Sequence, residues 1–330
     1  MKKRMLGTLE VSSIGLGCMS MSQAYGKPDP VESERNLLHA LDVGYTFLDT
    51  ASVYGLGHNE KLLGRVLKRH RNRYVLASKC GIVVDSDGKR GVDGSPKAIT
   101  RVCEESLTNL QTDVIDLYYL HRRDHNVPIE ESVGALGRLV EAGKIKCIGL
   151  SEVSSTTLRR AHAEVPITAV QSEYSLWTRD PEAKVLAACK ELGVGFVPFS
   201  PLGRAFLCGV IRSEDDLTKR DLRKGMPRFD EENLPKNVEL LAGLEEIAHE
   251  YSCTTGQLAL AWLLAQGDNI VPIPGTKHSK FAEENAAADA LVISADHLAR
   301  ADEIVNPNTV SGPRYGESQM ISLDPEDETQ

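Results

Sequence analysis

The 330-residue sequence lacks the features that mark secreted, membrane-spanning and nucleic-acid-binding proteins. Its seven cysteines are an odd number and contain no CxxC pair, which argues against a disulfide framework and against a zinc ribbon. No stretch approaches the roughly 20 apolar residues of a membrane span, and no apolar run follows the charged N-terminus. The formal net charge of -9 argues against a general nucleic-acid binder. We therefore expect a cytoplasmic globular protein with neither a membrane nor a nucleic acid as its partner.

What the sequence does contain is a regular alternation of short apolar runs with longer amphipathic stretches. The apolar runs are rich in Val, Ile, Leu and Tyr, as is typical of strands buried in a parallel sheet. They span Ile14–Cys18, Tyr45–Asp49, Tyr74–Lys79, Val114–His121, Cys147–Ser151, Ile167–Gln171, Val194–Ser200 and Ile270–Pro274. The stretches between them predict helices that include Ser33–Val43, Glu60–Lys68, Lys97–Leu110, Glu130–Ala142, Pro181–Leu192 and Gln257–Ala265.

Eight strands alternating with helices predict an α/β fold, a (β/α)8 TIM barrel formed as a single domain by residues 1–330. An open, doubly wound sheet is the alternative. Leu6-Gly7-Thr8-Leu9 can turn a small N-terminal hairpin that closes the bottom of the barrel. A long polar insert between Leu202 and Leu240 is expected to form a lid or a substrate wall, and residues 306–330 are expected to form a mobile tail.

Polar side chains stand where several of the predicted strands end. In a parallel barrel the functional site lies at the C-terminal ends of the strands. Asp49 ends the second strand and is followed by Tyr54, Lys79 ends the third strand, and His121 ends the fourth. Any one of these has an ordinary explanation as the first residue of a loop, but four titratable groups at three successive strand ends predict a site.

These four residue types suit proton transfer to a substrate. A buried Lys beside an Asp forms an ion pair, and an ammonium group near Tyr54 is expected to lower the pKa of the phenol from its reference value of about 10. Tyr54 would then be a general acid suited to neutral pH. A metal site at His121 and His125 is not expected, because the two residues follow a strand and no HEXXH motif is present.

Six segments occur in the order and spacing of a known family: LDTASVYG (48–55), LASKCG (76–81), IDLYYLH (115–121), IGLSE (148–152), FSPLGR (199–204) and IPGT (273–276). Over about residues 6–291 the chain resembles the aldo-keto reductase superfamily. GLGCMSMS (15–22) and GLSEVS further resemble the branch of YakC-type and perakine-type reductases. The resemblance implies that Tyr54 is the proton donor, that Asp49 holds Lys79 beside it, and that His121 orients the substrate carbonyl.

The resemblance also implies NADPH (NADP+) as the cofactor. Phe199 would stack on the nicotinamide, and Ser151, Glu152 and Gln171 would contact its carboxamide, although relatives commonly carry Asn where this chain has Glu152. The remaining implied cofactor contacts lie along the first strand, the loop after the seventh strand and the eighth strand with the helix that follows. They are Gly17, Cys18, Met19, Asp49, Ser200, Pro201, Leu202, Gly203, Arg204, Ile273, Gly275, Thr276, Lys277, Glu284 and Asn285.

Lys277 is the implied partner of the 2′-phosphate that distinguishes NADPH from NADH. Many relatives carry Arg or Gln four residues before Asn285, where this chain has Phe281. Gly15-Leu16-Gly17 is only half of a Rossmann fingerprint, with Ser20 in place of the third glycine.

The predicted function is reduction of an aldehyde or ketone to an alcohol by an NADP-dependent oxidoreductase. The implied substrate contacts are Met21, Tyr25, Tyr54 and His121. Met19, Tyr174 and Trp177 further suggest a partly apolar pocket able to hold an aromatic or alicyclic ketone, with sugars and pyridoxal as alternatives. The alternative is a cofactor-binding, redox-sensing regulatory protein on the same barrel. A metal-dependent hydrolase is a third possibility. Nothing in the sequence decides the oligomeric state.

Overall fold

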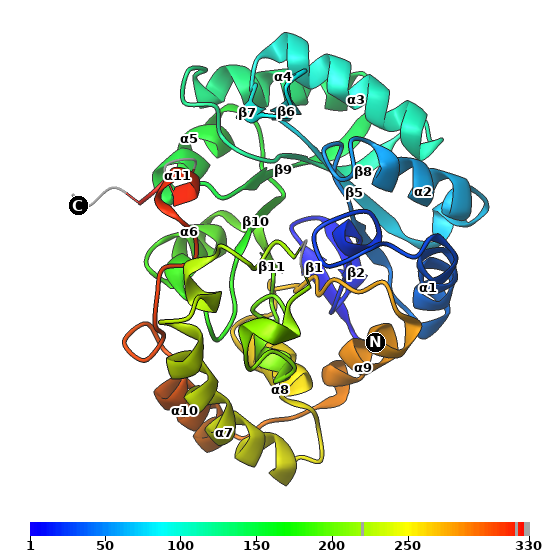
Figure 1. The fold of residues 1–330 in the computed structure, drawn as a ribbon. Helices are drawn as coiled ribbons and strands as arrows, with labels where there is room; N and C mark the ends of the chain where they lie inside the picture. The colour runs from blue at the N-terminus through cyan, green and yellow to red at the C-terminus, as the bar shows by residue number, and fades with distance from the viewer. Residues whose placement is uncertain (219–220, 321–322, 327–330) are drawn as a thin grey trace.

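A parallel sheet curled into a barrel, inside a ring of helices, forms the centre of the computed structural model, which describes residues 1–218, 221–320 and 323–326 (Figure 1). Seven strands pair in the order β11–β10–β9–β8–β5–β4–β3. They are Leu16–Gly17 (β3), Phe47–Asp49 (β4), Val75–Cys80 (β5), Ile115–Leu120 (β8), Ile145–Ser151 (β9), Ala169–Glu173 (β10) and Gly195–Phe199 (β11). All six pairs are parallel and the order follows the chain, whereas the strand order of a doubly wound sheet reverses.

The predicted eighth strand, 270–274, closes the barrel without forming a regular ladder. Val271 and Ile273 donate backbone N–H groups to β11, and the carbonyls of Pro272 and Pro274 accept from residues 15 and 17, at 2.9 to 3.1 Å. Pro272 and Pro274 have no N–H to donate in return. The pairing between residues 270–274 and the first strand therefore has only half of its usual hydrogen bonds. The sheet is nevertheless closed, and the predicted (β/α)8 barrel is confirmed.

An antiparallel hairpin covers the bottom of the barrel, as predicted. Its strands are β1 (Lys3–Leu6) and β2 (Leu9–Ser12), with Leu6 opposite Leu9. Gly7 turns between them in the left-handed region at φ +53°, where a Cβ would lie only 2.9 Å from the carbonyl oxygen of Thr168. Leu6 and Val11 are completely buried, so the hairpin plugs the barrel with side chains.

The helices form the outer ring, and capping residues mark several of their ends. Ser95 accepts a hydrogen bond from the N–H of Ala98 at the start of α3, and Gly44 ends α1 in the left-handed region. Asp29 caps α1, which begins at Pro30, three residues before the predicted start. The predicted helix from residue 181 begins only at residue 185, because residues 180–182 form a separate 3-10 turn. The helices are Pro30–Val43 (α1), His58–Leu67 (α2), Pro96–Leu110 (α3), Ile129–Glu141 (α4), Ser155–Glu164 (α5), Val185–Leu192 (α6), Leu234–Glu250 (α7), Thr255–Ala265 (α8), Ser279–Ala287 (α9), Ala295–Ile304 (α10) and Glu317–Met320 (α11).

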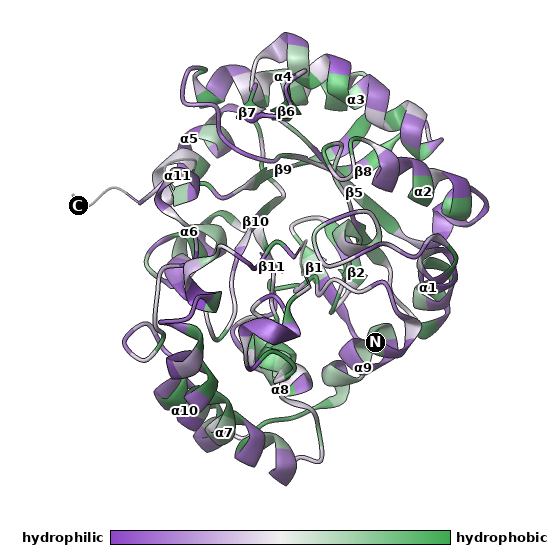
Figure 2. Ribbon diagram, viewed as in Figure 1, coloured by the Kyte–Doolittle hydropathy of each residue, from purple (hydrophilic) through white to green (hydrophobic). Residues whose placement is uncertain are grey.

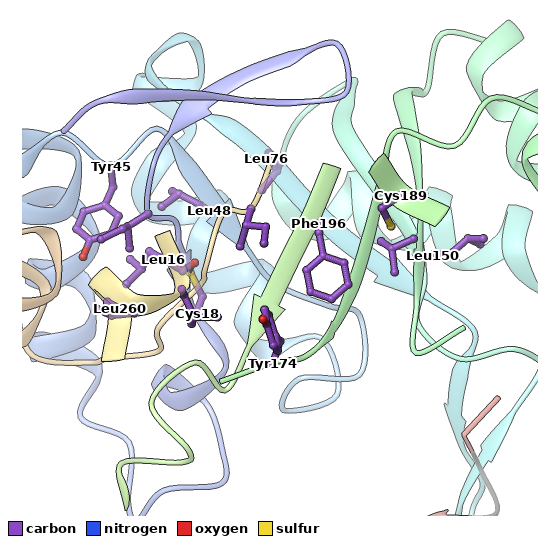
Figure 3. Close-up of a cluster of buried hydrophobic side chains, with 14 of the residues drawn as sticks. Leu16, Cys18, Tyr45, Leu48, Leu76, Leu150, Tyr174, Cys189, Phe196 and Leu260 are labelled. Atoms are coloured by element: carbon purple, nitrogen blue, oxygen red, sulfur yellow. Dashed lines mark hydrogen bonds between the residues drawn. The ribbon is translucent and has the colours of Figure 1, made fainter. Parts of the chain in front are cut away.

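The core consists of two layers. The inner layer fills the barrel and includes Phe47, Leu117 and Val197, all completely buried. The outer layer lies between the strands and the helices; Figure 3 shows part of it, including Leu48 and Leu150. Figure 2 shows apolar residues along the inner sides of the outer helices. No helix within the described ranges is both long enough and apolar enough to span a membrane.

Two segments differ from their predicted form. The polar insert contains three short 3-10 turns, Phe206–Cys208, Glu214–Asp216 and Pro227–Phe229, but it ends at residue 233, because α7 starts with Pro235 in its first turn. The segment after residue 306, expected to be a mobile tail, runs back over the barrel mouth. There Asp324 accepts hydrogen bonds from the backbone and side chain of Ser154 at 2.9 and 3.0 Å. Parts of both predictions, at 219–220, 321–322 and 327–330, lie outside the described residues.

A further antiparallel hairpin, β6 (Ile82–Val84) and β7 (Arg90–Val92), stands beside the barrel mouth between β5 and α3.

Candidate active site

A cavity of about 820 Å³ opens at the C-terminal ends of the barrel strands. Its volume falls within the range of roughly 300–1,000 Å³ that is usual for small-molecule sites. The strand-end residues Asp49, Ser151 and Phe199 line it, together with Gly275 behind the eighth strand segment. In a parallel barrel this face carries the functional site, so the cavity is the candidate active site.

Most of the site residues predicted from the sequence line this cavity. They are Gly17, Met19, Tyr25, Asp49, Tyr54, His121, Ser151, Gln171, Phe199, Ser200, Pro201, Leu202, Arg204, Ile273, Gly275, Thr276 and Lys277. Lys79 lies directly behind the wall, completely buried. The predicted contacts that do not line the cavity are Cys18, Met21, Glu152, Gly203, Glu284 and Asn285.

Asp49, Lys79 and Tyr54 come together at the base of the cavity because β4 and β5 are neighbours in the sheet. The ammonium of Lys79 forms an ion pair with the carboxylate of Asp49 and donates to the carbonyl of Thr50 at 2.9 Å. The same Nζ atom lies 3.5 Å from the hydroxyl oxygen of Tyr54. Of these groups only the phenol of Tyr54 and an edge of Asp49 reach the cavity, so Tyr54 is the group that can exchange a proton with a ligand.

Burial keeps Tyr54 protonated at this base, and the neighbouring groups keep Lys79 charged. Burial raises the pKa of the Tyr54 phenol above its usual value, and the attraction of Lys79 only partly opposes this. The expectation of a lowered pKa is therefore wrong for the net shift, because the cost of burying a phenolate exceeds the effect of the ammonium. Burial lowers the pKa of Lys79, but Asp49 and Tyr54 outweigh it and the net shift is upward.

His121 stands beside Tyr54 at the end of β8. The two rings lie edge to face, with centroids 5.9 Å apart and an interplanar angle of 81°. Burial, followed by the positive charges of Lys79, Arg122 and Arg90, holds the pKa of His121 well below its usual value. The imidazole is therefore neutral at pH 7 and can donate one N–H to a ligand oxygen.

Gln171 and Ser151, predicted to contact a carboxamide, lie on the wall and are also held by the protein. Gln171 donates to the second carboxylate oxygen of Asp49 at 2.8 Å. Ser151 accepts from Arg122 at 3.2 Å. Both side chains are thereby fixed in position next to Asp49, Tyr54, Lys79 and His121, which we call the tetrad.

Glu152 turns away from the cavity into a buried ion-pair network. Its carboxylate accepts from the backbone N–H of Glu173 at 2.8 Å and from Arg314 at 2.7 and 3.3 Å. Glu173 in turn accepts two hydrogen bonds from Arg204, at 2.8 and 2.6 Å. Arg314 comes from the C-terminal segment, 162 residues after Glu152. The carboxylate of Glu152 is therefore bound by the protein itself and does not line the cavity.

The loop after β11 is held by the same network. Ser200, Arg204 and Ala205 all adopt left-handed backbone angles, at φ +48°, +56° and +71°. The guanidinium of Arg204 is committed to Glu173 and also lies 5.1 Å from the ring centroid of Tyr315. What this loop presents to the cavity is therefore largely its backbone, in a conformation that the buried ion pairs maintain.

The far end of the cavity, toward α9, carries a positive charge with no carboxylate beside it. Lys277 donates to the carbonyl oxygens of Tyr25 and Lys27, at 3.1 and 2.9 Å, and among the described residues it forms no ion pair. Phe281 lines the cavity here and is 44% exposed. The side chain of Glu284 instead accepts a hydrogen bond from Thr254 at 2.9 Å.

Several wall residues were not singled out from the sequence. Val53, Arg122, Arg223 and Tyr315 lie on the wall, as do Ile82, Arg90 and Val92 of the β6–β7 hairpin. Most of them belong to loops whose position depends on tertiary contacts, and only the even spacing of 82, 84, 90 and 92 about a turn signals a shared face. Met21, Tyr174 and Trp177, expected in the substrate pocket, lie buried in the outer core layer.

Comparison with known proteins agrees with this geometry. The profile of the Aldo/keto reductase family matches residues 13–306. A probable aldo-keto reductase of Glycine max is 46% identical over 316 residues, covering 94% of this chain and 90% of that protein. The yakc aldo-keto reductase [NADP(+)] of Schizosaccharomyces pombe is 42% identical over 329 residues, covering 97% of each.

Solved structures show the same fold. A glycerol dehydrogenase of Gluconobacter oxydans superposes with a TM-score of 0.84 at 27% identity, covering 94% of this chain and 96% of that one. An aldo/keto reductase of Klebsiella pneumoniae, solved in complex with NADP and acetate, gives a TM-score of 0.73 at 27% identity, covering 96% and 99%. This chain belongs to the aldo/keto reductase family, whose enzymes are oxidoreductases that act on carbonyl groups.

Proposed function

We propose that this protein reduces an aldehyde or ketone to the alcohol with NADPH, and that Tyr54 donates the proton. The observation that carries the proposal is the arrangement of Asp49, Lys79 and Tyr54: a buried ammonium group lies 3.5 Å from a phenol that faces a cavity. Such a phenol is protonated at neutral pH, and it has a neighbouring charge that stabilises the anion left behind when the proton is given up.

The far end of the cavity supports the choice of NADPH. The cationic Lys277 has no carboxylate partner among the described residues, and a 2′-phosphate would supply one. The aromatic ring of Phe199, at the end of β11 on the cavity wall, suits a nicotinamide ring. The relative from Schizosaccharomyces pombe is named for NADP(+), and the Klebsiella protein was solved with NADP. When bound, the cofactor supplies the hydride.

The residues of this chain supply the rest of the chemistry. The neutral imidazole of His121 donates a hydrogen bond to the carbonyl oxygen and so holds the substrate beside Tyr54. As negative charge develops on that oxygen, Tyr54 transfers its proton to it. The phenolate then faces the ammonium of Lys79, which Asp49 keeps in place. A proton from solvent restores Tyr54, and in alcohol oxidation the same groups act in reverse.

The test is the oxidation of NADPH by the purified protein with a neutral aromatic aldehyde. We expect turnover by the wild type and a loss of at least about a hundredfold in kcat for Tyr54→Phe, the usual contribution of a general acid. Tyr74→Phe is the matched control, because it removes the hydroxyl of a buried tyrosine at the other end of the same barrel. Tight NADPH binding without turnover of any carbonyl compound would instead favour the redox-sensing alternative.

A further inference from the structure

The β6–β7 hairpin carries one charged side chain, that of Arg90, on a face that is otherwise apolar. Ile82 pairs with Val92 and Val84 pairs with Arg90. Paired residues and residues two apart lie on the same face of a hairpin, so these four side chains share one face. Ile82, Arg90 and Val92 all line the cavity, which identifies this face as the one turned toward the ligand.

Arg90 has no partner for its charge within the described part of the chain. No hydrogen bond or ion pair joins its guanidinium to residues 1–218, 221–320 or 323–326. Two other arginines of the wall are neutralised, because Arg204 pairs with Glu173 and Arg223 pairs with Asp221. Arg90 differs from them because its side chain is exposed and its charge is free to pair with a ligand in the cavity.

The second cation near Arg90 is not neutralised by a carboxylate either. Arg122 donates to the carbonyl of His121 at 2.7 Å and to the hydroxyl of Ser151, and both acceptors are uncharged. Both guanidinium groups are near enough to the tetrad to lower the pKa of His121. Of the carboxylates on the described wall, Asp49 is bound by Lys79, and Asp216 accepts from backbone N–H groups of its own turn. The tetrad end of the cavity thus carries a surplus of positive charge.

We infer that the physiological substrate is an aldehyde or ketone that also bears a carboxylate, and that Arg90 binds this carboxylate. A guanidinium group is the side chain best shaped for a carboxylate. Val53, Ile82 and Val92 provide an apolar wall for the carbon skeleton between the two functional groups. The inference deepens the proposed function and rests on it, since it names the class of carbonyl compound that the tetrad reduces.

The experiment compares 4-carboxybenzaldehyde with its methyl ester, which has the same ring and a similar aldehyde but no charge. We expect the wild type to prefer the carboxylate in kcat/KM by about tenfold, the usual value of one charge-assisted hydrogen bond to arginine. Arg90→Met should abolish the preference mainly through a higher KM for the carboxylate, and should change kcat/KM for the ester far less than kcat/KM for the carboxylate. Lys89→Met is the matched control, because it removes the same charge from the adjacent position of the same hairpin and should keep the preference.

Equal kcat/KM values for the two aldehydes with the wild type would overturn the inference and leave the proposed function standing. A preference that survives Arg90→Met would overturn the role of Arg90. If the wild type with NADPH reduces neither aldehyde, the proposed function itself fails, and the inference with it.

Discussion

The ion-pair network that joins Glu152 to Arg314 yields a prediction whose size follows from the structure. Glu152, Glu173, Arg204 and Arg314 together have no net charge, and the side chains of the Glu152–Arg314 pair are only 3% and 8% exposed. Arg314→Gln leaves one uncompensated negative charge in this site. Glu152→Gln removes the buried partner of Arg314, which then keeps only the more exposed Asp180, 3.1 Å from its Nε, and the more distant Glu173. Removing one partner of a buried pair costs about 3–5 kcal/mol.

We expect the lower end of this range for Arg314→Gln, because Glu152 keeps the hydrogen bond from the backbone of Glu173. A loss of about 3 kcal/mol corresponds to a fall in Tm of roughly 4 °C for a chain of this size. Glu152→Gln should cost less, since Arg314 still has Asp180 at 3.1 Å and Glu173 at 3.8 Å. The double variant is neutral again, so it should be more stable than the sum of the single changes by about 2 kcal/mol.

The assay is urea unfolding followed by circular dichroism for the wild type, both single variants and the double variant. Arg159→Gln is the control, because Arg159 also forms two hydrogen bonds to a glutamate but is 43% exposed. Such an exposed pair is worth at most about 1 kcal/mol. Two results together would refute the view that buried ion pairs hold the C-terminal segment in place. The single variants would be at least as stable as this control, and their effects would add in the double variant.

Other consequences concern the tetrad and the cofactor. Because the pKa of Tyr54 is raised and that of His121 lies well below its usual value, kcat for reduction should be level through neutral pH and fall only in the alkaline range where Tyr54 loses its proton. Lys79→Met removes the charge that opposes the raised pKa, so kcat should fall and its alkaline limb should move to higher pH; an unchanged profile would contradict the role of Lys79. Lys277→Met should weaken NADPH binding about tenfold, measured by fluorescence titration, and leave NADH binding unchanged, whereas an equal loss for both would remove the 2′-phosphate assignment.

The barrel and the tetrad were predictable because their signals are local. Each strand is a contiguous apolar run, and Asp49, Lys79 and His121 each end one, so the parallel order alone brings them to one face. The eighth strand was predictable as an apolar run. Its incomplete hydrogen bonding was not, because it arises from the pairing of Pro272 and Pro274 with the first strand.

What the sequence could not reveal depends on contacts between distant segments. The sequence predicts that Glu152 contacts the cofactor. In the structure its carboxylate instead accepts a hydrogen bond from Arg314, 162 residues later in the chain. Arg90 could not be identified as a candidate substrate contact from the sequence. Its role follows from its pairing with Val84 in the hairpin and from the lack of a charge partner among the described residues. The direction of the Tyr54 pKa shift was predicted wrongly because burial sets it. The predicted proximity of Lys79 says nothing about how deeply the phenol is buried.

The measurement that bears most directly on the chemistry is the single-turnover rate of hydride transfer from pre-bound NADPH to an aldehyde, for the wild type and Tyr54→Phe. We expect equal NADPH affinity in the two proteins and a transfer rate lower by about 10²–10⁴ in the variant, because only the proton donor has been removed. Equal transfer rates would show that the proton comes from elsewhere and would contradict the assignment of Tyr54.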